Sequence, residues 1–162
     1  MRREKLVSFV VPGAPHGWER ATPSVAFSAR KGLRYIKMLT PNKTRSYESA
    51  VGHIAKGAMQ GRPPHNGAIS IFVRARFRPG ERMAAWRRAL ARVGLLPMTD
   101  PPDLDNIFKA LKDGMNKIVY TDDRRVDFIA GKKTYARDDE PAQVAVTVWA
   151  LAEPLQPPRR NR

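Results

Sequence analysis

Alternating apolar and polar positions predict the strands of this chain. The clearest run covers residues 68–77, where every second side chain from Ile69 to Phe77 is apolar and the opposite face carries Arg74 and Arg76. Four further apolar runs bounded by turn residues predict strands at residues 6–11, 34–38, 126–133 and 144–149. The last two runs flank a polar connection, so they are expected to form a hairpin with a long loop.

Apolar residues at three- and four-residue spacing predict the helices. The first main helix is expected to run from a cap at Thr44 or Ser46 to about Met59. A short basic helix is expected at residues 81–93, and the second main helix at residues 105–118. This last helix places its apolar residues on one stripe and its charged residues on the opposite one.

Together these elements predict an α+β fold, a mixed sheet packed against two main helices. Residues 16–34 show no period and are expected to form a long loop. The length of 162 residues suits a single domain over residues 1–153, and the Pro- and Arg-rich tail at 154–162 is expected to be disordered. The chain has no cysteine, and its N-terminal apolar run is too short for a signal peptide or a membrane span. A cytoplasmic protein without a membrane partner is expected.

Charge is distributed unevenly along the chain. The formal net charge is +15, and residues 1–99 account for all of it, with 19 Lys and Arg against four acids. A basic surface attracts nucleic acid because binding releases the counterions condensed on the phosphates. Seven of the 15 acids, by contrast, fall within residues 100–127. This contrast indicates a metal-dependent enzyme in which cations hold a polyanion and aspartates hold a metal against it.

The acidic segment contains the residue types that phosphodiester hydrolysis needs. Asp103 and Asp105 lie at the start of the second main helix, and Lys109 follows one turn later on the face of Asp105. Clustered carboxylates can hold one or two Mg²⁺ against a phosphate. The ordinary explanation is structural, because an Asp before a helix is most often an N-cap and the doubled Asp122 and Asp123 suit a turn. The conjunction favours a metal, since gathered carboxylates repel one another unless a cation binds.

The same residues carry a family resemblance. Pro-Asp-Leu-Asp-Asn at 102–106, Lys-Ala-Leu-Lys-Asp-Gly at 109–114 and Asp-Asp at 122–123 resemble the RusA family of Holliday-junction resolvases in order and spacing. Residues 40–48 resemble the segment that opens the first helix in phage-type members, and the resemblance covers most of residues 6–149.

The resemblance implies a RusA-like fold and specific roles for the acidic residues. Asp103, Asp105 and Asp123 would be the metal-binding catalytic carboxylates, Lys109 the catalytic lysine and Asp122 an additional ligand. The implied cofactor is Mg²⁺, with Mn²⁺ as a substitute. The implied protein is a homodimer that resolves four-way DNA junctions in recombination and repair by symmetric cuts, in the cytosol of a bacterium or of a phage-infected host. Side chains alternate on a strand, so only one of the two neighbouring aspartates is expected to face the metal, and which one is open.

Phosphate contacts are expected from Arg20, Lys43 and Arg45, through the family resemblance and their position in basic loops, and from Lys112. The basic segment 80–94 fits equally a DNA-contacting helix and a solvated surface helix. Two other interpretations of the whole protein stay open. One widens the substrate to flaps and other branched DNA, and the other is a non-catalytic basic nucleic-acid-binding protein whose aspartates are caps and turns.

Overall fold

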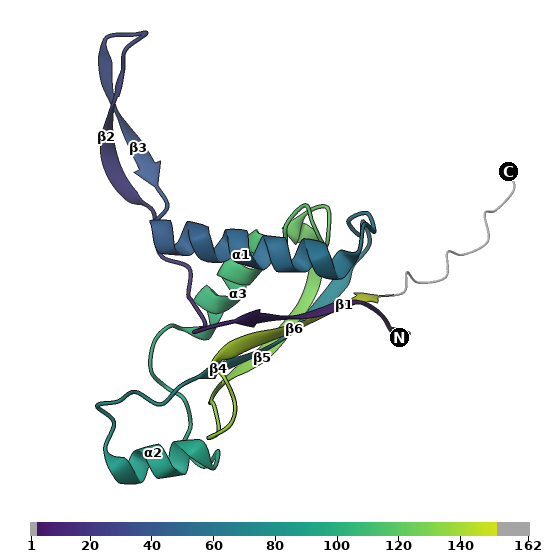
Figure 1. Ribbon diagram of the computed structural model, residues 1–162. Helices are drawn as coiled ribbons and strands as arrows, with labels where there is room; N and C mark the ends of the chain where they lie inside the picture. Colours follow the sequence, from purple (N-terminus) through teal and green to yellow (C-terminus); the bar gives the residue numbers. More distant parts are fainter. Residues whose placement is uncertain (1–2, 152–162) are drawn as a thin grey trace, which may run out of the picture.

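A four-stranded mixed sheet forms the centre of the protein in the computed structural model, which describes residues 3–151 (Figure 1). The order of its strands is β1-β6-β4-β5. Their bounds are β1 (Arg3–Pro12), β4 (Ile69–Phe77), β5 (Val126–Tyr135) and β6 (Gln143–Leu151). The pair β4–β5 is parallel, whereas β6 is antiparallel to both of its neighbours. The predicted α+β fold with a mixed sheet is therefore confirmed.

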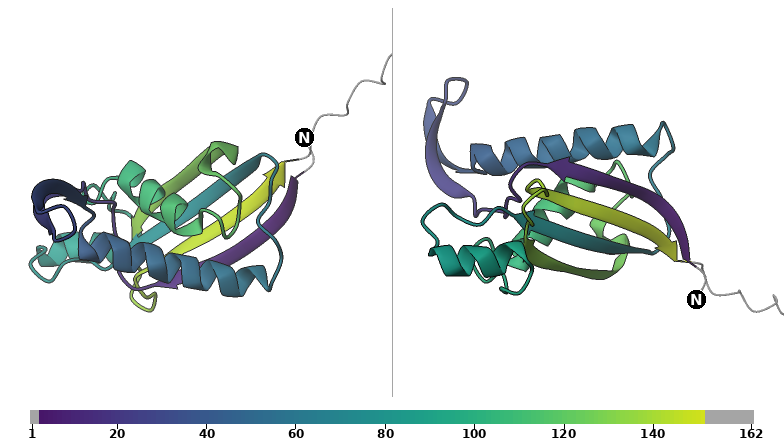
Figure 2. Two further views of the ribbon diagram at one scale, coloured as in Figure 1. Left: turned by 90° about the horizontal axis from the view of Figure 1, so that it is seen from above. Right: turned by 60° about the horizontal axis from the view of Figure 1, so that its bottom comes forward.

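Two helices, α1 (Asn42–Met59) and α3 (Leu104–Met115), cover one face of the sheet (Figure 2). The alternation predicted for β4 is confirmed, because the side chains from Ile69 to Phe77 at odd positions are buried beneath the helices while Arg74 is exposed on the other face. Val144, Val146 and Val148 of β6 are fully buried in the same core. Burial of one stripe of each helix against one face of the sheet holds the two layers together.

The expected hairpin between residues 126–133 and 144–149 was wrong. Both segments are strands, but β6 lies between β1 and β4, and β5 pairs with the outer edge of β4. A parallel pair needs a long crossover connection, and the segment from β4 to β5 supplies it with α3 packed on the sheet. The apolar pattern identifies a strand, but it does not say which strands lie beside it in the sheet. That order depends on how the whole core is buried.

The expected long loop at residues 16–34 was also wrong. It contains β2 (Thr22–Ser28), which pairs antiparallel with β3 (Leu33–Leu39), and the second strand predicted at 34–38 is part of β3. This hairpin projects from the N-terminal end of α1, away from the sheet (Figure 1). The alternation in β2 was hard to recognise because small residues such as Ala26 separate the large apolar ones.

The predicted helices are present with altered ends. The first begins at Asn42 with Pro41 at the N-cap and no capping side chain, so neither Thr44 nor Ser46 is the cap; the buried Thr44 hydroxyl instead accepts a hydrogen bond from the Glu19 backbone N–H at 3.3 Å. The basic helix is shorter than predicted, α2 (Ala85–Arg92).

None of the helices in residues 3–151 is long and apolar enough to span a membrane. The tail at 154–162 lies outside the described residues.

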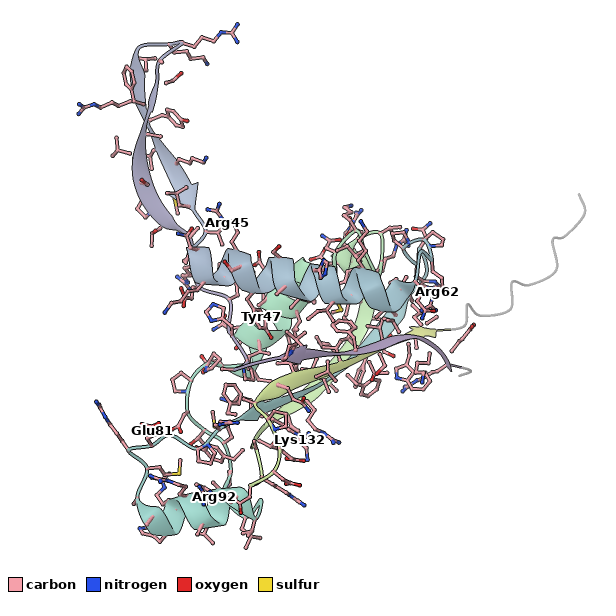
Figure 3. The ribbon with its side chains drawn as sticks, viewed as in Figure 1. Arg45, Tyr47, Arg62, Glu81, Arg92 and Lys132 are labelled. Atoms are coloured by element: carbon pink, nitrogen blue, oxygen red, sulfur yellow. The ribbon has the colours of Figure 1, made fainter. Side chains whose placement is uncertain are left out.

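Tyr47 lies on the side of α1 that faces the body of the protein (Figure 3), with its ring 5.7 Å from that of His16. Burial raises the pKa of Tyr47 to about 12. Between about pH 10 and 12 the native protein therefore binds more protons than the unfolded chain, so its stability falls as pH rises.

In the Tyr47→Phe variant, the free energy of unfolding is expected to fall by roughly 2–3 kcal/mol less than in the wild type as pH rises through this range. Each unit of pKa shift corresponds to about 1.4 kcal/mol. At pH 8 the variant should be within about 1 kcal/mol of wild type. Urea unfolding at pH 8 and pH 11.5 measures both values. An equal loss in the two proteins at high pH would contradict the assignment.

Candidate active site

The candidate site follows the exposed stripe of α3. Asp105, Lys109 and Asp113 recur every four residues on this stripe, while Ile107 and Leu111 are fully buried on the opposite side. Asp103 occupies the N-cap position with extended backbone, but its side chain makes no capping hydrogen bond. Capping therefore does not explain these aspartates: Asp105 lies inside the first turn, and the Asp103 carboxylate is exposed without that role.

Side chains of β5 anchor the loop that delivers Asp103. The Lys133 ammonium donates hydrogen bonds to the carbonyl oxygens of Asp100 and Pro102, at 2.8 and 2.9 Å. The Tyr135 hydroxyl donates to the Asp100 carboxylate at 2.8 Å. Burial, together with this bond to a carboxylate, raises the pKa of Tyr135 to about 12, so the hydroxyl keeps its proton. The start of α3 is thus attached to the sheet on which the helix lies.

A second loop packs across the start of α3 and brings an aromatic ring to Lys109. The backbone N–H of Trp18 donates a hydrogen bond to the backbone carbonyl of Asn106 at 2.9 Å. Gly17 is required here, because a Cβ at this position would lie 2.5 Å from Cβ of Pro102. The Lys109 ammonium lies 3.1 Å from the centre of the Trp18 ring, a cation–π contact that restrains a side chain with many free rotamers.

Lys109 also acts electrostatically on two carboxylates from different helices. Burial raises the pKa of Glu48 on α1, and the charge of Asp113 raises it further, whereas Lys109 lowers it. Burial likewise raises the pKa of Asp113, with Lys109 acting against it and Asp123 adding to it. The charge of Lys109 therefore favours the ionised forms of both Glu48 and Asp113, and Lys112 adds to this effect at Asp113.

The neighbouring aspartates Asp122 and Asp123 have different surroundings. The Asp122 carboxylate accepts hydrogen bonds from the backbone N–H of Arg124 at 3.0 Å and from its Nε at 2.9 Å, which caps the short helix η1 (Asp123–Arg125). These hydrogen bonds lower the pKa of Asp122 to about 2. Asp123 is exposed, and its charge raises the pKa of Asp113 and contributes to the raised pKa of Tyr120. Asp122 thus has a structural partner, whereas Asp123 acts electrostatically on α3.

The carboxylates suit a hard divalent cation by type but form separate groups. Within residues 3–151, no three His, Cys, Asp or Glu side chains lie close enough together to hold a metal ion. Asp105 and Asp113 are eight residues apart on α3, or about 12 Å along its axis, with Lys109 between them. Carboxylate oxygens are the ligands that Mg²⁺ prefers, and exposed aspartates such as Asp103 can change rotamer. The donor set fits the cation in chemistry, and its carboxylates would have to converge around it.

Three of the four predicted phosphate-binding residues lie at the base of the β2–β3 hairpin. Arg45 stands at the base of the β2–β3 hairpin (Figure 3) and donates to the Thr40 carbonyl at 3.3 Å. Arg20 and Lys43 are exposed at the same base, and Lys112 is half-buried on α3. The basic segment 80–94 lies elsewhere, because α2 is apart from both α1 and the hairpin (Figure 1).

Three residues of the site were not predicted. Asp113 had a usable signal, since it follows Lys109 at the four-residue spacing that already connected Lys109 to Asp105. Glu48 and Trp18 had none, because only the packing of α1 and of the loop at residues 15–19 against α3 brings them to Lys109.

Comparison with known proteins places the chain in one family. A family model described as "Endodeoxyribonuclease RusA" matches residues 12–148. The chain is also 29% identical over 137 residues to the "Uncharacterized protein YqaN" of Bacillus subtilis (strain 168). That alignment covers 82% of this chain and 89% of the relative.

Proposed function

The chain belongs to the endodeoxyribonuclease RusA family, and we propose that it is a metal-dependent endonuclease that resolves four-way DNA junctions. Family membership implies a Holliday-junction endonuclease acting on branched DNA. The observation that supports the activity in this chain is the stripe of α3, where Asp103 and Asp105 are not explained by capping and Lys109 lies among carboxylates. A basic exterior around this acidic stripe suits a phosphodiester substrate.

In the proposed mechanism, Asp103, Asp105 and Asp123 would hold Mg²⁺, for which Mn²⁺ could substitute. A bound divalent cation supplies positive charge against the phosphate oxygens during hydrolysis. Lys109 places a second positive charge at the scissile phosphate, where negative charge grows in the transition state. The Trp18 ring would hold the lysine in position and the charges of Glu48 and Asp113 would attract it. The products would carry 5′-phosphate and 3′-hydroxyl ends.

Two cuts in opposite strands require two active sites, so we propose that the protein acts as a homodimer. Arg20, Lys43, Arg45 and Lys112 would contact DNA phosphates near each site. Sedimentation equilibrium at micromolar concentration tests the oligomeric state, and a monomer both free and on the junction would exclude paired cutting by one assembly.

Cleavage assays test the proposed function directly. End-labelled four-way junction, flap and linear duplex are incubated with the protein in Mg²⁺ or EDTA. We expect symmetric cuts in the junction with Mg²⁺ only. Equal cleavage of flaps and junctions would replace this function with a broader branched-DNA nuclease. Binding without cleavage in Mg²⁺ and in Mn²⁺ would identify a non-catalytic nucleic-acid-binding protein.

Paired variants test the choice between the two neighbouring aspartates. Asp123→Asn is expected to lower the cleavage rate by about 10²-fold, because it removes a charge that acts on the α3 stripe. Asp122→Asn should lose less than about fivefold, since asparagine can still cap η1 and an exposed ion pair contributes little. Single-turnover junction cleavage in Mg²⁺ measures both, and the opposite ranking would assign the role to Asp122.

A further inference from the structure

The β2–β3 hairpin has one strongly apolar face. Directly paired residues of an antiparallel hairpin point to the same side, so the pairs Val25–Ile36 and Pro23–Met38 share a face with Phe27. The large apolar side chains of this face are exposed: Val25 by 70%, Phe27 by 65%, Ile36 by 73% and Met38 by 59%. The other face carries small and polar residues such as Ser24 and Lys37 beside Leu33 and Tyr35.

The hairpin has no structural reason to be apolar. Within residues 3–151 its extensive contacts are between its own two strands, and it extends away from the core (Figure 1). An isolated two-stranded hairpin is marginally stable in water, and an exposed apolar cluster of this kind marks an interaction site. A partner is needed to cover the apolar face.

Charge indicates which partner this is. Residues 20–45 contain seven Lys and Arg and no acid. Arg30 and Lys31 lie at the turn, and Arg34 shares the apolar face through its pairing with Phe27. Two such hairpins from two copies of the chain would repel each other, whereas a polyanion complements every one of these charges.

The base of the hairpin lies at the candidate active site. The chain enters β2 four residues after Trp18, which contacts Lys109, and leaves β3 into α1, which carries Glu48. Each strand has seven residues, so the arm can reach roughly 23 Å from this base. A substrate whose scissile phosphate lies at Lys109 would therefore extend within reach of the arm.

We propose that the β2–β3 hairpin is a DNA-binding arm that recognises the branch point. Its apolar face, with Phe27 and Ile36 at the centre, packs on bases that are unstacked where duplex arms meet. Arg34 and the cations of the turn contact the flanking phosphates. Apolar side chains insert between base steps that are unstacked, and aromatic ones stack on exposed bases, whereas an intact linear duplex must first be unstacked at a cost of a few kcal/mol per step. The choice of branched DNA rests on the proposed function.

Two matched double variants test this arm. Phe27→Ser/Ile36→Ser removes one aromatic and one aliphatic side chain from the apolar face, and Leu33→Ser/Tyr35→Ser removes one of each from the opposite face, where they are 63% and 50% exposed. Binding to a four-way junction and to a linear duplex is measured in EDTA, so that cleavage plays no part. We expect the first variant to bind the junction roughly 10- to 100-fold more weakly and the duplex within about twofold of wild type. The second should bind both within about threefold.

Equal losses in the two variants, or equal losses on junction and duplex, would overturn the proposal. A second readout tests the phosphate contacts and not the apolar side chains: Arg34→Gln is expected to reduce the slope of log affinity against log salt by about one, and an unchanged slope would count against the arm. Sedimentation of the first variant tests the alternative partner of the apolar face, a second copy of this chain. If the wild type is a dimer and this variant a monomer, the apolar face binds a second copy and not DNA.

Failure of the proposed function is distinguished from failure of the arm. If the protein cleaves nothing in Mg²⁺ but the first variant loses junction binding selectively, the arm stands and the nuclease does not. If the wild type cleaves the junction in Mg²⁺ but all variants bind the junction as tightly as the wild type, the nuclease stands and the arm does not.

Discussion

Asp105→Asn is expected to lower the rate of junction cleavage by roughly 10²–10³-fold, or about 3–4 kcal/mol in the barrier. The substitution keeps the shape of the side chain but removes the charge that Asp105 would offer to Mg²⁺ one turn before Lys109. The residue also lies in the first turn of α3, where an acid stabilises the helix. That contribution is only about 0.3–1 kcal/mol, so stability and catalysis should change by very different amounts. Single-turnover cleavage in Mg²⁺ and thermal unfolding measure the two effects.

Asp139→Asn is the matched control for this variant. Asp139 is exposed in the connection between β5 and β6, and the control removes the same charge from the protein away from α3. It should leave the cleavage rate and the unfolding temperature near those of wild type. If Asp105→Asn cleaves as fast as the control, Asp105 is not part of the active site.

Gly114→Val is expected to destabilise the protein by about 3 kcal/mol. A Cβ at Gly114 would lie 2.8 Å from the Glu48 carbonyl oxygen and 2.8 Å from Cβ of Val51, so α1 and α3 would have to separate. Gly52 faces the same crossing from α1, with its own Cβ position 3.0 Å from the Gly114 carbonyl oxygen. The contact therefore depends on glycine from both helices. Urea unfolding at pH 7 measures the free energy lost.

Gly57→Ala provides the contrasting control within α1. A Cβ at Gly57 has no neighbour within 4 Å, so alanine should stabilise the helix by about 0.5–1 kcal/mol. A Gly114→Val protein as stable as wild type would show that the helices can separate at little cost. If it folds but loses cleavage, the displacement of Glu48 from Lys109 becomes the direct explanation.

Local periodicity explains why much of the fold could be predicted from the sequence. Burial of one face imposes a period of two on β4 and of three to four on α3, and both patterns are visible without knowledge of the neighbours. Strand pairing carries no such local signature. The position of β6 between β1 and β4 depends on burying the whole core, which is why a hairpin with β5 was the wrong expectation. The β2–β3 hairpin could not be predicted in this way, because its apolar face is exposed and packs against no part of the core.

The sequence by itself determined the family, the basic charge and the line of Asp105 and Lys109 along one helix face, because residues four apart in a helix lie one turn from each other on the same side. Only the tertiary structure decided what surrounds that line. Packing of α1 brings Glu48 to Lys109, and the loop at residues 15–19 brings Trp18. The turn after α3 directs Asp122 to Arg124 and leaves Asp123 to act on α3. The contacts of Glu48 and Trp18 join segments far apart along the chain, and burial and electrostatics across the whole domain select them, whereas the Asp122–Arg124 contact is local.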